Sequence, residues 1–132
     1  MVNIIAALLA FTAQDGGFTD DPEILSQYMV QSCLHQQVTQ QGGEPVDYIP
    51  FCTCLDDHLG TSSSAPVYRA MALGSQGAIG EYAQVDDPAG ALAEAQRIMG
   101  TVEQEEMAAV QANLQSGLSM CLARMPGQSA AE

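Results

Sequence analysis

The sequence predicts an all-α fold, a small bundle of four to five helices stapled by two disulfides. No stretch of five or more residues alternates apolar and polar side chains of strand-forming types. Residues that favour helices, namely Ala, Gln, Leu, Met and Glu, dominate instead. Helix start and stop signals recur along the chain, and four cysteines are spaced so that they connect separate helices.

Length and charge limit the function of the protein. The chain has 132 residues, which suits one domain, and 47% of them are hydrophobic. Its net charge is −13, and it contains three arginines and no lysine. This charge repels nucleic acid and anionic lipid headgroups, so we expect neither as a partner. Because the chain has no lysine, it cannot form a Schiff base through a lysine side chain or supply the lysine of a P-loop.

Residues 1–13 are predicted to be a signal peptide, followed by a single helical domain over residues 14–132. An unbroken apolar run from Ile4 to Phe11 suits the hydrophobic region of such a signal and is far too short to span a membrane. Cleavage is expected after Ala13. We therefore expect a periplasmic or secreted protein without an integral membrane span, where four cysteines can oxidise.

The first helix is predicted over residues 22–40. Asp21 suits the N-cap and Pro22 the first helical position, and Gly42 suits the end. Spacings of four residues place Cys33 on the buried face of this helix, as a bridging cysteine requires. That face comprises Leu25, Met29 and Cys33.

The central helix is predicted around Cys52 and Cys54. Asp47 is the expected N-cap, Pro50 lies in the first turn, and Gly60 is the expected end. Residues two apart on a helix differ in direction by about 200°, so the two sulfurs should face different neighbours.

Excluding a Cys52–Cys54 bond leaves two disulfide pairings. One joins Cys33 to Cys52 and Cys54 to Cys121, and the other joins Cys33 to Cys54 and Cys52 to Cys121. In both pairings the central helix is tied to an upstream and a downstream segment. The spacing does not decide between them.

Three further helices are expected. Ser64 caps a short helix over residues 66–73. Three glycines make residues 74–81 hard to assign, and two interpretations stay open: a flexible connector or the continuation of a weak helix. Asp87 and Pro88 start a helix over 88–99 that ends at Gly100.

The longest helix is predicted over residues 102–125. Thr101 and Gln104 match a capping box at its start. Its apolar face has spacings of four, three and four residues and comprises Leu114, Leu118, Cys121 and Met125.

Metal binding is the alternative interpretation of the cysteines. Zinc takes Cys and His ligands and copper(I) takes Cys and Met, and His58 lies one helical turn beyond Cys54. The candidate ligands are Cys33, Cys52, Cys54, His58 and Cys121. The spacing matches no zinc ribbon or finger, so we expect disulfides and no cofactor.

Motifs of catalysis are missing from the sequence. It contains no Cys-x-x-Cys, G-x-S-x-G or H-E-x-x-H pattern, and its paired aspartates are explained by helix capping. We therefore expect a non-enzymatic exported protein that binds another protein or serves as a small subunit of a cell-envelope assembly. A third class, an enzyme or ligand carrier, would be indicated by a cavity between helices lined by His35, His58 or arginines.

Overall fold

The computed structural model describes residues 17–127 and confirms the all-α fold. Across this range there are five α-helices and no strand. The helices are α2 (Pro22–Gln41), α3 (Ile49–Ser62), α4 (Ala65–Ile79), α5 (Pro88–Met99) and α6 (Gln104–Cys121). Short 3₁₀ turns span Pro45–Tyr48, Gly80–Tyr82 and Leu122–Arg124. The predicted signal peptide, residues 1–13, lies outside the described residues.

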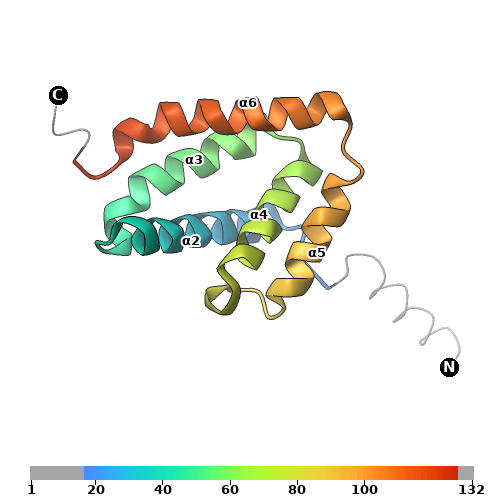
Figure 1. Ribbon diagram of the computed structural model, residues 1–132, viewed down its shortest axis with the longest axis horizontal. Coiled ribbons are helices and arrows are strands. Elements are labelled where there is room, and N and C mark those ends of the chain that lie inside the picture. Colours follow the sequence, from blue (N-terminus) through green and yellow to red (C-terminus); the bar gives the residue numbers. More distant parts are fainter. Residues whose placement is uncertain (1–16, 128–132) are drawn as a thin grey trace, which may run out of the picture.

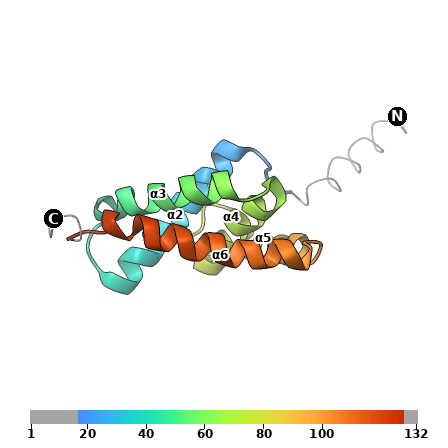
Figure 2. The ribbon, with the colours of Figure 1, turned by 90° about the horizontal axis from the view of Figure 1, so that it is seen from above.

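Four of the helices form two packed pairs, and α2 contacts one helix of each pair. Helix α4 packs along α5, and α3 packs along α6, while α2 contacts both α3 and α4. Figure 1 shows this division, with α6 extending along one side of the molecule and no helix on its outer side. Seen from above in Figure 2, α6 lies in front of the other helices, and no helix covers it on this side.

Three helix starts follow the sequence prediction. The Asp21 carboxylate accepts a hydrogen bond from the Glu23 backbone N–H, and the Asp87 carboxylate accepts one from Gly90. The Ser64 hydroxyl accepts one from Val67. Each cap satisfies a backbone donor that has no partner inside its own helix.

The predicted limits of the central helix are wrong at both ends. The N-cap of α3 is Tyr48, because a 3₁₀ turn precedes the helix, and Asp47 accepts a hydrogen bond from the Glu44 backbone N–H instead. Gly60 lies inside the helix, which continues to Ser62. A glycine in a helix costs only about 1 kcal/mol, so it did not end α3 here.

Two later boundaries also differ from prediction. Helix α4 runs through Gly74 and Gly77 to Ile79, past the end expected near residue 73, so of the two interpretations of residues 74–81 the continued helix is correct as far as Ile79. At the start of α6, Glu103 is the N-cap, and the Thr101 hydroxyl donates to the Ile98 carbonyl. The predicted capping box is therefore wrong.

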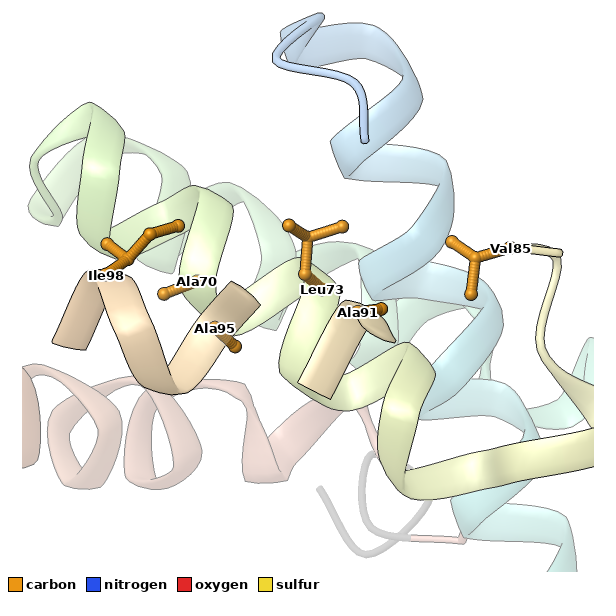
Figure 3. Close-up of a cluster of buried hydrophobic side chains, with 6 residues drawn as sticks. All are labelled: Ala70, Leu73, Val85, Ala91, Ala95 and Ile98. Carbon is orange, nitrogen blue, oxygen red and sulfur yellow. The ribbon is translucent and has the colours of Figure 1, made fainter. Parts of the chain in front are cut away.

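Small side chains allow α4 and α5 to approach closely. A Cβ atom added at Gly77 would lie 2.7 Å from the Leu92 Cβ, a distance that real Cβ atoms essentially never show. The core between these helices is correspondingly rich in alanine (Figure 3). It comprises Ala70, Leu73, Val85, Ala91, Ala95 and Ile98. Glycine within α4 therefore serves packing and not flexibility.

The cysteines form the first of the two pairings left open by the sequence. Cys33 bonds Cys52, and Cys54 bonds Cys121, so the two sulfurs of the central helix reach opposite neighbours as expected. Cys52 and Cys121 are buried in a second core cluster beside Phe51. The two bridges tie α3 to α2 on one side and to α6 on the other.

Candidate functional site

A cavity of about 920 Å³ lies where the ends of four helices meet. The first turns of α2 and α4 and the last turns of α3 and α5 surround it. Ligand cavities in proteins occupy roughly 300–1,000 Å³, so its size suits a small molecule. Its polar wall includes Asp20, Ser26, Asp56, Asp57, Ser63, Tyr68, Arg69, Glu94 and Arg97.

Asp56 is the buried acid of this cavity, with 6% of its surface exposed. Its carboxylate accepts hydrogen bonds from the hydroxyls of Ser26 on α2 and Tyr68 on α4. The site therefore joins three helices through one carboxylate. Burial raises the pKa of the Tyr68 hydroxyl above its ordinary value, and the neighbouring Asp56 raises that pKa further, because a phenolate beside a carboxylate is unfavourable.

An ion-pair cluster also lines the cavity. The Glu94 carboxylate accepts hydrogen bonds from Arg69 at 2.9 Å and from Arg97 at 2.7 Å. The Arg69 guanidinium also donates to the backbone carbonyls of Phe18 and Thr19, which fixes the segment before α2. Hydrogen bonds from Arg97 lower the pKa of Glu94 to about 2, and those from Arg69 add to the effect.

The contribution of the Glu94 ion pairs to the free energy of unfolding should depend on pH. A carboxylate whose pKa is lowered by folding stabilises the protein above its unfolded-state pKa and loses that contribution as the pH falls towards the folded-state value. We expect Glu94→Gln to lower the free energy of unfolding by about 1–2 kcal/mol at pH 7, with exposed Arg97 limiting the effect.

The difference between wild type and Glu94→Gln should shrink between about pH 4.5 and pH 2, the ordinary and folded-state pKa values of this carboxyl group. Urea unfolding at several pH values measures it. Glu81→Gln, at an exposed acid, is the control. A difference that stays constant across this pH range would contradict the role assigned to Glu94.

The predicted metal ligands do not form a site. All four cysteines are bonded to each other as disulfides, so none is available as a thiolate. The ring of His58 lies 3.1 Å from the Asn113 backbone carbonyl, and His35 stacks on Tyr82 at 4.5 Å. Within residues 17–127, no three His, Cys, Asp or Glu side chains gather in a way that could hold a metal ion.

The cavity contains residues that the sequence analysis named and others that it missed. Arg69 and Arg97 line it, whereas neither His35 nor His58 does. The buried carboxylate of Asp56 was missed. A signal existed, since a carboxylate lies at helical spacing among the buried residues Cys52, Asp56 and Leu59 of α3.

An apolar stripe on α6 is the second candidate site. The side chains of Met107, Leu114 and Leu118 are 37%, 40% and 42% exposed, and Leu122 follows one turn later. Spacings of seven, four and four residues place them along one side of the helix. Helix α6 meets α3 through Gly117, where an added Cβ would lie 2.7 Å from the His58 ring. The stripe lies beside this contact, and its side chains remain partly exposed.

The fold and its bonds define an all-α domain stapled by two disulfides, a feature that fits an oxidising compartment. Among the helices of the described chain, none has the length and apolar character needed to cross a bilayer. No family model matches the sequence, and no curated protein and no solved structure matches it either.

Proposed function

We propose that this protein is a non-enzymatic exported helical protein that acts as a protein-binding module or as a small subunit of a cell-envelope assembly. The observation that carries the proposal is the exposed stripe of Met107, Leu114, Leu118 and Leu122. A contiguous exposed apolar surface is a common mark of a protein interface. Disulfides that tie α3 and α6 together hold this surface in place outside the reducing cytosol.

The proposed partner is a basic protein with an apolar groove. The chain carries a net charge of −13, and the N-terminal end of the stripe is flanked by Glu103, Glu105 and Glu106. Two copies of this chain would repel each other, whereas basic residues around a groove would be attracted and would steer association. An amphipathic helix that lies in an apolar groove is a recurring mode of recognition.

Comparative capture from the cell-envelope fraction of the host tests the proposal. The oxidised wild-type protein is compared with Leu114→Glu/Leu118→Glu, which places charge on the stripe. Ala112→Glu/Ser116→Glu is the matched control, because residues two positions away lie about 200° around the same helix and are exposed here.

The expected result is one basic protein retained by the wild type and the control and lost with the stripe variant. Calorimetry with that protein after purification should then show binding that weakens at least about tenfold on the stripe substitution. Affinity should fall with added salt. Identical retention by all three proteins, or self-association of the wild type in sedimentation experiments, would contradict the proposal.

A further inference from the structure

The buried carboxylate of Asp56 has no cationic partner among residues 17–127. The groups that donate to it are the neutral hydroxyls of Ser26 and Tyr68. Charged groups removed from water are normally paired with an opposite charge. A carboxylate at 6% exposure in the wall of a cavity therefore leaves a place for a positive charge from outside the chain.

The arginines of the cavity do not serve this purpose. Arg69 and Arg97 both bind Glu94. With four acids and two arginines, the lining keeps a formal excess of two negative charges. The net charge of −13 adds an attraction for cations at longer range.

The rest of the lining suits an organic ligand. Leu25, Pro66 and Ile98 supply apolar surface beside the acids. The Ser63 hydroxyl, also in the lining, is buried and has no hydrogen-bond partner among the described residues. Buried polar atoms in native proteins rarely lack a partner, and such exceptions call for an explanation. A bound ligand with N–H donors would provide it.

We propose that this cavity binds an organic ammonium ion, a primary amine with an apolar body, whose charged head pairs with Asp56. The proposal is independent of the α6 surface. Its geometry places the ammonium near Asp56 and the apolar body against the walls supplied by α2 and α5.

Ligand titrations followed by amide NMR of the oxidised full-length protein test this inference. The probe is n-hexylamine, which is protonated at pH 7 as a lysine side chain is. Hexanoate and 1-hexanol have the same apolar body with a negative or a neutral head. We expect hexylamine to shift the amide signals of Ser26, Asp56 and Tyr68 and to bind at least about tenfold more tightly than either analogue.

Two variants assign the binding to the carboxylate. Asp56→Asn keeps the shape and removes the charge, and should weaken hexylamine binding by at least about tenfold. Asp86→Asn removes one exposed charge outside the cavity and should leave binding unchanged. If circular dichroism shows that Asp56→Asn does not fold, the proposal is tested by comparing the binding of hexylamine, hexanoate and 1-hexanol to the wild-type protein. Equal binding of hexanoate, amide shifts outside the cavity, or unchanged binding by folded Asp56→Asn would overturn the proposal.

Discussion

Replacing Cys54 and Cys121 by alanine will lower the free energy of unfolding by about 4 kcal/mol and will loosen α6 first. The bridge closes a loop with a sequence separation of 67, which sets this magnitude in the chain-entropy model. Helix α6 packs mainly on α3, and none of its residues belongs to the core between α4 and α5. A domain's whole stability is of the order of 5–15 kcal/mol, so this is a large fraction of it.

Amide hydrogen exchange measures the local part of this effect. Protection should fall in residues 104–121 while α4 keeps its protection. The control is Cys33→Ala/Cys52→Ala, which opens a loop with a separation of 19 and should cost about 3 kcal/mol. Uniform loss of protection in all helices of the Cys54/Cys121 variant would show that α6 is not an independent unit.

Gln76→Leu is expected to destabilise the protein by about 3 kcal/mol or more, although the substitution is apolar and of similar size. Gln76 is fully buried, and its amide oxygen accepts hydrogen bonds from the backbone N–H groups of Gln84 at 2.6 Å and Val85 at 3.2 Å. Its amide nitrogen donates to Ser32 at 2.7 Å and to the Tyr28 carbonyl at 3.1 Å. Leucine leaves these groups without a partner, at about 1–3 kcal/mol for each buried one.

Chemical denaturation of Gln76→Leu beside Gln96→Leu tests this role. Gln96 is exposed on α5, so the same chemical change there should alter the free energy of unfolding by no more than about 0.5 kcal/mol. The slope of free energy against denaturant should stay constant in both variants. Equal denaturation midpoints for Gln76→Leu and Gln96→Leu would show that the buried amide of Gln76 does not hold the segment after α4 against α2.

The starts of several helices were determined by short stretches of sequence. Asp21 and Asp87 followed by proline, and Ser64, cap helices in the structure as the sequence predicts. A cap needs only a side-chain oxygen and a backbone N–H two or three residues later, so neighbouring residues decide it. The end predicted from Gly60 was wrong, and the glycines at 74–80 left the end of α4 open, because packing overrides the helix propensity of single residues.

Sequence by itself determined that the protein is helical and that the central helix has two sulfurs facing different neighbours, because helical geometry is local. Only the tertiary structure decided which cysteine each sulfur meets. The same holds for the cavity, where Ser26, Asp56 and Tyr68 come from three helices. Contacts between distant segments depend on how whole helices pack against one another, and no short stretch of sequence contains that information.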